Sequence, residues 1–215
     1  MRSFTDIKDL SKSDIEAILF RTRQEKKIIA EKGILNIEKI LLGKTVALIF
    51  EKPSTRTRVS FDVAIRQLGG NSIIMNSGEM QLGRGESIAD TSRVLSKYVD
   101  AIMLRCLKHE SLSEMAEYAS VPVINGLTNK SHPCQVLADI MTFLEIKGNL
   151  KNKKIVWYGD YNNVTESWVH ASSKFNFNFV ISSPENIDID YTAINESNAN
   201  GGSVVVIHDP YEAAV

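Results

Sequence analysis

Hydrophobic residues occur along this chain either in short continuous runs or at spaced positions among polar residues. The continuous runs predict buried strands, and the spaced positions predict amphipathic helices, because helical side chains repeat every 3.6 residues. The predicted strands cover residues 44–50, 72–75, 100–104, 121–124, 154–158, 179–182 and 203–207. The predicted helices cover residues 10–30, 57–68, 87–98, 112–119, 133–146 and 164–175. Strands repeatedly separated by helices indicate an α/β fold with a doubly wound parallel sheet, which binds ligands at the carboxyl ends of its strands.

The polar segment 147–153, KGNLKNK, is the best candidate for a linker between two domains. We therefore predict a first domain over residues 1–148 and a second over residues 149–215, both doubly wound. The second segment is too short for an ordinary domain of this type, so we expect it to be incomplete. Residues 184–202 are rich in Asn, Ser and Asp, and predict a polar connection with at most a short helix.

Composition narrows the class of protein. The chain has 25 Lys plus Arg and 26 Asp plus Glu, a net charge of −1, which gives no reason to expect a nucleic-acid or anionic-membrane partner. Hydrophobic residues make up 43%, which argues against a disordered protein. No apolar run approaches the roughly 18 residues of a membrane span, and the chain start lacks the layout of a signal peptide, so we expect a cytoplasmic protein. Two cysteines, Cys106 and Cys134, are too few for a disulfide scaffold or a zinc site, and we expect both to be reduced packing residues.

The strongest candidate for chemistry is the segment FEKPSTRTRVSF, residues 50–61, where a strand ends and a helix begins. Free backbone N–H groups at the helix start, the helix dipole, short hydroxyls and guanidinium groups together suit a phosphate. The alternative is a capped helix with solvated arginines. Residues 78–85, GEMQLGRG, fail the Walker A pattern, so a nucleotide is not indicated. The anion-binding candidates are Ser54, Thr55, Arg56, Thr57 and Arg58.

Two further places carry candidate residues. Arg105 ends a predicted strand and would lie at the ligand-binding edge of the sheet, although it could also be a solvated strand end. His132 begins the segment HPCQ at a predicted helix start, where a lone histidine could simply cap the helix.

These three motifs, in this order, resemble the carbamoyltransferase family. The resemblance implies that residues 54–58 bind the phosphate of carbamoyl phosphate, and that Arg105, His132 and Gln135 contact its carbamoyl group. The segment 80–95, MQLGRGESIADTSRVL, resembles the ornithine type, with Gln81 where the aspartate type has a lysine that reaches a neighbouring subunit. The turn 159–168, GDYNNVTESW, resembles the ornithine-binding start of the second domain, which implies contacts from Asn163 and, as a second candidate, Asn162.

The family's reaction would transfer the carbamoyl group to the side-chain amine of L-ornithine, giving L-citrulline and phosphate in biosynthetic or catabolic arginine metabolism. Arg56, Thr57, Arg105 and His132 would then be the catalytic residues, stabilising negative charge on phosphate and on the carbonyl oxygen. The resemblance implies no metal and no cofactor. It also implies a homotrimer, with Gln81 at the neighbouring subunit's phosphate loop.

Family members continue beyond HDPYEAAV with further acceptor-binding segments, so we expect this chain to be a fragment of a longer enzyme. Two alternatives stay open at this point: a non-catalytic module that binds carbamoyl phosphate, and a carbamoyltransferase for another amine such as putrescine or an acylornithine. The remaining histidines receive no role, and we expect His170 to form a surface pair with Glu166, four residues earlier on the same helix.

Overall fold

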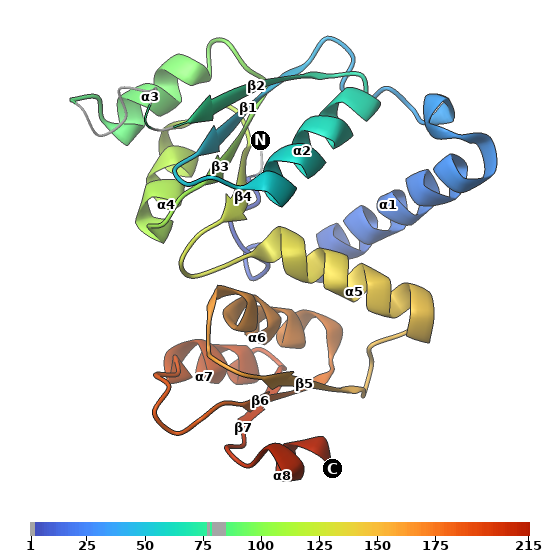
Figure 1. Cartoon of the computed structure of the whole chain (residues 1–215), viewed down its shortest axis with the longest axis vertical. Helices are drawn as coiled ribbons and strands as arrows, with labels where there is room; N and C mark the ends of the chain where they lie inside the picture. The colour runs from blue at the N-terminus through green and yellow to red at the C-terminus, as the bar shows by residue number, and fades with distance from the viewer. Residues whose placement is uncertain (1–2, 77, 79–84) are drawn as a thin grey trace. The chain divides into compact units, whose positions relative to one another are not determined.

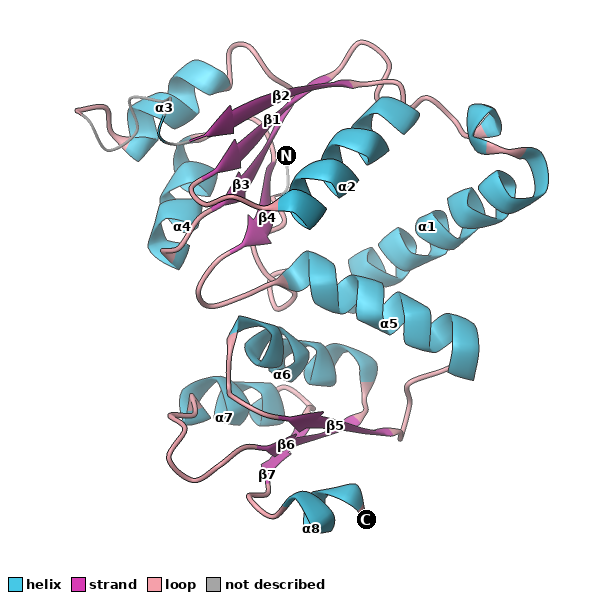
Figure 2. Cartoon of the chain, in the orientation of Figure 1, coloured by secondary structure: helices cyan, strands magenta, loops and turns pink. Residues whose placement is uncertain are grey.

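The computed structural model describes residues 3–76, 78 and 85–215, which form an α/β structure of alternating strands and helices (Figure 1). The strands, magenta in Figure 2, are β1 (Thr45–Phe50), β2 (Asn71–Asn76), β3 (Ala101–Arg105), β4 (Val123–Leu127), β5 (Lys154–Tyr158), β6 (Asn178–Ser182) and β7 (Ser203–Val206). The helices are α1 (Lys12–Lys32), α2 (Thr55–Gln67), α3 (Ile88–Leu95), α4 (His109–Tyr118), α5 (Pro133–Lys147), α6 (Asn163–Phe175), α7 (Tyr191–Ala199) and α8 (Pro210–Ala214), with a short 3-10 helix, η1 (Ile34–Asn36). None of the helices in these ranges combines the length and apolar character needed to cross a bilayer.

The chain folds into two compact units. The described residues of the first unit come from 1–5 and 16–128, and those of the second come from 6–15 and 129–215. The N-terminal segment therefore contributes to both units. Helix α5 belongs to the second unit, although it precedes the predicted linker at residues 147–153. The domain boundary between residues 148 and 149 stays a prediction.

The first unit is built on a four-stranded parallel sheet with strand order β2-β1-β3-β4. Side chains of β1 alternate between its two faces, as a strand requires. Ala47 and Ile49 pack in one cluster with Leu112 and Met115 of α4. Leu48 packs on the opposite face in a cluster with Ile65 of α2, and Figure 1 shows α2 on one side of the sheet and α3 and α4 on the other. This sheet is doubly wound, as the sequence predicts.

The chain's N-terminus adds to this sheet in a way the sequence pattern does not predict. Phe4 forms a parallel bridge with Ile124, donating its N–H to Val123 O at 2.8 Å and accepting from the N–H of Asn125 at 2.8 Å. The side chain of Asn125, which is fully buried, donates to Thr5 O at 2.8 Å. These bonds cover the exposed edge of β4, which otherwise would present unpaired backbone groups.

The second unit contains a three-stranded parallel sheet in the order β5-β6-β7. Within this unit, Figure 1 shows α6 and α7 on one side of the sheet and α8 on the other. Trp168 of α6 stacks on Phe179 of β6 with ring centroids 6.0 Å apart, and Phe177 meets both rings edge-on. This aromatic cluster fixes α6, and therefore its N-terminal end, against the sheet.

All the predicted strands and helices are present, and most differences are at their ends. The helix predicted from residue 57 begins at Thr55, and the strand predicted over 121–124 runs from Val123 to Leu127. Residues 184–202 contain the nine-residue helix α7, which buries Ala193 and Ile194, and α8 was not predicted. Short polar helices of this kind have weak periodicity, so their burial pattern appears only in the folded chain.

Candidate active site

The first group of candidate residues lies at the start of α2, just after the carboxyl end of β1. Ser54 is the N-cap residue in extended conformation (φ −151°, ψ 110°), and its side chain makes no capping hydrogen bond. Arg56 and Arg58 are exposed, whereas Thr57 is half-buried. The helix start therefore presents uncapped backbone N–H groups, a serine hydroxyl and two guanidinium groups, which is the composition of an anion site. The alternative of a side-chain-capped helix does not describe this turn.

Arg105 joins this group from the end of β3. Phe50 and Arg105 are register partners at the carboxyl ends of β1 and β3, and Arg105 Nη1 donates to Thr57 Oγ1 at 2.9 Å. Glu51 connects the same strand ends, since its N–H donates to Arg105 O at 2.9 Å and its Oε2 accepts from the N–H of Leu107 at 2.8 Å. The predicted residues Thr57 and Arg105 are thus brought into direct contact.

This part of the site is strongly cationic. Partial burial, followed by the positive charge of Arg56, lowers the pKa of Arg105 below its ordinary value. An arginine remains ionised even so, because its ordinary pKa lies far above neutral pH. Two neighbouring guanidinium groups repel each other in the absence of a counter-charge, so the arrangement favours a bound anion.

A backbone irregularity beside Arg105 was not expected from the sequence. The β3–β4 register shifts there, because Leu104 pairs with Asn125 but Arg105 pairs with Leu127, so Gly126 is the extra residue. A Cβ atom at position 126 would overlap Met103 Sδ and lie 3.3 Å from Arg105 Cβ. Any larger residue here would force the side chain of Met103 to move, and irregularities of this kind commonly redirect a side chain next to a binding site.

The second group of candidates lies in the second unit, at the starts of α5 and α6. His132 is the N-cap residue of α5, is half-buried, and makes no side-chain capping hydrogen bond. Its backbone N–H donates to Ser167 Oγ at 2.8 Å, and the same hydroxyl donates to Asn163 O at 3.0 Å. The fully buried Ser167 therefore links two predicted site positions. The sequence motif contained Ser167, but nothing in its pattern identified this linking role.

Two other candidates have definite partners in the structure. Gln135 is exposed and donates from Nε2 to Asp139 Oδ1 at 2.8 Å, which leaves Oε1 as the atom able to accept from a carbamoyl NH2 group. Asn162 is the N-cap residue of α6, and its Oδ1 accepts from the N–H groups of Val164 at 2.9 Å and Thr165 at 3.3 Å. Asn162 is therefore engaged as the cap of this helix.

Gln81 lies outside the described residues, so its predicted role is not addressed by the structure. Within the described ranges, no group of three or more His, Cys, Asp or Glu side chains is arranged to hold a metal ion. Burial raises the pKa of both cysteine thiols to about 12, which is the behaviour of packing residues.

The prediction that His170 forms a surface pair with Glu166 is wrong. His170 is only 5% exposed, and its Nδ1 lies 2.8 Å from Oδ1 of Asp6, which is 3% exposed. Helical spacing places residues 166 and 170 on one face but does not reveal that the N-terminal segment covers that face within the second unit.

Comparison with known proteins agrees with this geometry. Residues 2–145 match the family model of the aspartate/ornithine carbamoyltransferase carbamoyl-P binding domain, and residues 151–215 match the Asp/Orn binding domain of the same family. The ornithine carbamoyltransferase of Paracoccus denitrificans is 49% identical over 99% of this chain and 70% of its own length, and that of Rhodopseudomonas palustris is 51% identical over 99% and 69%.

A solved structure, ornithine carbamoyltransferase from Pyrococcus furiosus, superposes with a TM-score of 0.92 at 46% identity, covering 99% of this chain and 68% of that one. The chain thus spans about 70% of the length of the curated relatives that it matches. With both family models matching in order, and with the phosphate-type helix start in place, this chain belongs to the aspartate/ornithine carbamoyltransferase family.

Proposed function

We propose that this protein transfers the carbamoyl group of carbamoyl phosphate to the side-chain amine of L-ornithine, giving L-citrulline and phosphate. The observation that carries the proposal is the contact of Arg105 with Thr57 inside an uncapped Ser-Thr-Arg-Thr-Arg helix start. The curated relatives cited above are about half identical to this chain and are named ornithine carbamoyltransferase, which favours ornithine over other acceptors.

The first unit binds the phosphate group. Ser54, Thr55 and Thr57 donate hydroxyl and backbone hydrogen bonds, while Arg56 and Arg58 supply positive charge. Substrate binding here relieves the repulsion between Arg56 and Arg105, because the dianion lies between like charges.

The reaction develops negative charge on the carbonyl oxygen. The uncharged amine attacks the carbonyl carbon and forms the new C–N bond, and the bond from that carbon to the phosphate oxygen then breaks. The attacking nitrogen loses one proton, which leaves on the phosphate as hydrogen phosphate. Arg105, His132 and the Thr57 hydroxyl stabilise the oxyanion, and such preorganised donors commonly contribute a large share of the rate enhancement. Gln135 accepts from the carbamoyl NH2 group, and Asn163 binds the polar groups of ornithine.

The direct test is steady-state formation of citrulline from carbamoyl phosphate and ornithine. We expect citrulline and phosphate to appear in equal amounts, with ornithine preferred over putrescine and acylornithines. A higher kcat/KM for another acceptor would contradict the ornithine assignment while leaving the reaction class intact.

The non-catalytic alternative predicts a different pair of results. Calorimetric titration would then detect carbamoyl phosphate binding, but no citrulline would form at any ornithine concentration. Turnover that scales with protein concentration and disappears in Arg105→Ala would exclude this alternative, because a contaminating enzyme would be unaffected by the substitution.

The family resemblance further supports a homotrimer that acts in cytoplasmic arginine metabolism. The outward face of α2 exposes Val59 (55%) and Val63 (41%) next to Arg56, which is consistent with a subunit contact beside the phosphate site. Sedimentation equilibrium at micromolar concentration tests this proposal: a trimer mass is expected, and a monomer would contradict it.

A further inference from the structure

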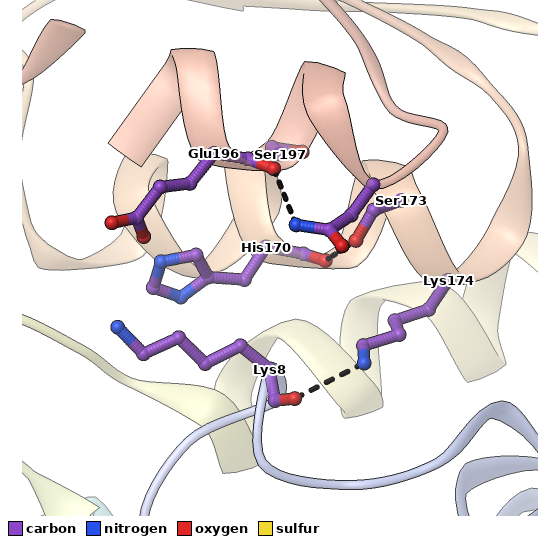
Figure 3. Close-up of a pocket in the computed structure, with 7 residues that line it drawn as sticks. Lys8, His170, Ser173, Lys174, Glu196 and Ser197 are labelled. Atoms are coloured by element: carbon purple, nitrogen blue, oxygen red, sulfur yellow. Dashed lines mark hydrogen bonds between the residues drawn. The ribbon is translucent and has the colours of Figure 1, made fainter. Parts of the chain in front are cut away.

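A cavity of about 300 Å³ lies in the second unit, and none of its lining residues is assigned to the reaction (Figure 3). Its walls come from the C-terminal halves of α6 and α7 and from the N-terminal segment. The lining residues are Lys8, His170, Ser173, Lys174, Glu196, Ser197 and Asn200. This volume is at the lower end of the range for small-molecule sites, about 300–1,000 Å³, so only a small ligand fits.

Several polar groups of the wall are already engaged. Ser173 Oγ donates to His170 O at 3.0 Å, and Ser197 Oγ donates to Val169 O at 2.7 Å. Lys174 Nζ donates to Lys8 O at 3.0 Å, which fixes the N-terminal segment to α6 (Figure 3). Asn200 Nδ2 donates to Glu196 O at 2.7 Å. The wall is therefore pre-formed, and the groups left to meet a ligand are the imidazole of His170, the charged ends of Lys8 and Glu196, and Oδ1 of Asn200.

His170 is the least expected of these groups. Its Nδ1 is held by Asp6, and its Nε2 is buried with no hydrogen-bond partner among the described residues. Burial by itself raises the pKa of Asp6, but the hydrogen bond and charge of His170, together with Lys8, lower it below its ordinary value. The ionised carboxylate thus fixes the ring orientation, and a buried polar atom without a partner is costly unless something binds it.

The charges around His170 have opposite signs. In Figure 3 the imidazole points between the ammonium end of Lys8 and the carboxylate end of Glu196. Within residues 3–76, 78 and 85–215, neither of these two charged groups forms an ion pair, although both side chains line the same cavity. Two further carboxyl groups interact with the ring: Asp6, which is bonded to Nδ1, and Glu166, whose pKa is raised mainly by burial.

This combination selects one class of ligand. A simple cation would meet Glu196 but be repelled by Lys8, and a simple anion would have the opposite problem. A zwitterion satisfies both, with its ammonium on Glu196 and its carboxylate on Lys8, while either end supplies a partner for His170 Nε2. We propose that this cavity is a second binding site, and that it takes a small amino acid in its zwitterionic form.

Calorimetric titration of the whole chain tests the proposal. The probes are glycine, β-alanine and 4-aminobutyrate, which carry the same two charges at increasing separation, with methylammonium and acetate as the single-charge halves. We expect saturable binding of at least one zwitterion, with affinity at least about tenfold above that of either half. Two results would overturn the proposal. Methylammonium or acetate could bind as tightly as the best zwitterion, or no zwitterion could show saturable binding.

Variants of the two exposed charges locate the binding. Glu196→Gln and Lys8→Met should each weaken the best zwitterion by about tenfold, since each removes one charged contact. Glu212→Gln and Lys151→Met are matched controls outside the cavity and should leave binding unchanged. Unchanged binding in both cavity variants would contradict the site. Because the readout is binding and not turnover, this result is independent of whether the chain forms citrulline.

Discussion

The hydroxyl of Ser167 accepts a hydrogen bond from the backbone N–H of His132 at 2.8 Å, although the two residues are 35 positions apart. The same hydroxyl donates to Asn163 O, so one buried side chain sets the relative position of two helix starts in the second unit. Both helix starts carry residues that we assign to the reaction. We therefore expect Ser167 to act as a positioning residue.

Replacing Ser167 with alanine should lower kcat by about tenfold or more, because small displacements of positioned groups are costly in catalysis. The buried N–H of His132 also loses its acceptor, which costs about 1–3 kcal/mol of stability. Steady-state kinetics and urea unfolding measure the two effects. Thr142→Ala is the control, since Thr142 makes a similar hydroxyl-to-backbone bond on the exposed face of α5. A Ser167→Ala enzyme with unchanged kcat would rule out the positioning role.

Arg105→Lys should reduce kcat/KM by about 10²–10³ because lysine keeps the charge but loses the planar fork that reaches Thr57 Oγ1. Thr57→Val should have a smaller effect in the same direction, and Thr57→Ser should restore most of the activity. The matched control is Arg66→Lys in α2, where the exposed arginine pairs with half-buried Asp62. Equal effects of Arg105→Lys and Arg66→Lys on kcat/KM would show that Arg105 has no special part in the reaction.

Arg56→Ala should abolish measurable binding of carbamoyl phosphate in calorimetric titration. The substitution removes one of the charges that attract the phosphate dianion to the start of α2. Arg66→Ala, on the same helix but at its other end, should bind normally. Near-normal affinity in Arg56→Ala would contradict the phosphate site.

Asp6→Asn should destabilise the fold by a few kcal/mol, since it leaves His170 without the partner of a buried pair. The pKa of Asp6 is lowered in the folded state, so its contribution is present above the unfolded value of about 3.9 and is lost as pH falls through the folded value. The stability difference between wild type and Asp6→Asn in urea unfolding should therefore be large at pH 7 and shrink below about pH 4. Asp188→Asn, an exposed position in the same unit, should show no difference at either pH.

The two cysteines should react slowly with a disulfide reagent at pH 8. Burial raises both thiol pKa values to about 12, so about one thiol in 10⁴ is ionised at that pH. Unfolding in urea should release both thiols to react within the mixing time of an ordinary experiment. Rapid labelling of the native protein would show that a thiol is accessible and contradict the packing role.

The candidate anion site at the start of α2 was predictable because its parts are contiguous. Ser54 to Arg58 form a single helix start, and the hydrogen-bonding needs of a helix start are local. For the sheet, the sequence predicted a parallel, doubly wound arrangement but not the order of the strands. Alternating burial in β1 assigns Ala47 and Leu48 to opposite faces, but it does not say which strand lies next to which.

The sequence by itself therefore determined the α/β class, the helix start that carries residues 54–58 and the family resemblance. Only the tertiary structure decided that Arg105 donates to Thr57 and that Ser167 links His132 to Asn163. It also decided that His170 is buried and hydrogen-bonded to Asp6, which is 164 positions away in the chain. The physical reason is that periodicity indicates which side of a helix or strand is buried, and that the hydrogen-bonding needs of a helix start are met by residues close to it in the sequence. A long-range partner depends instead on strand register and chain path, which no local pattern encodes.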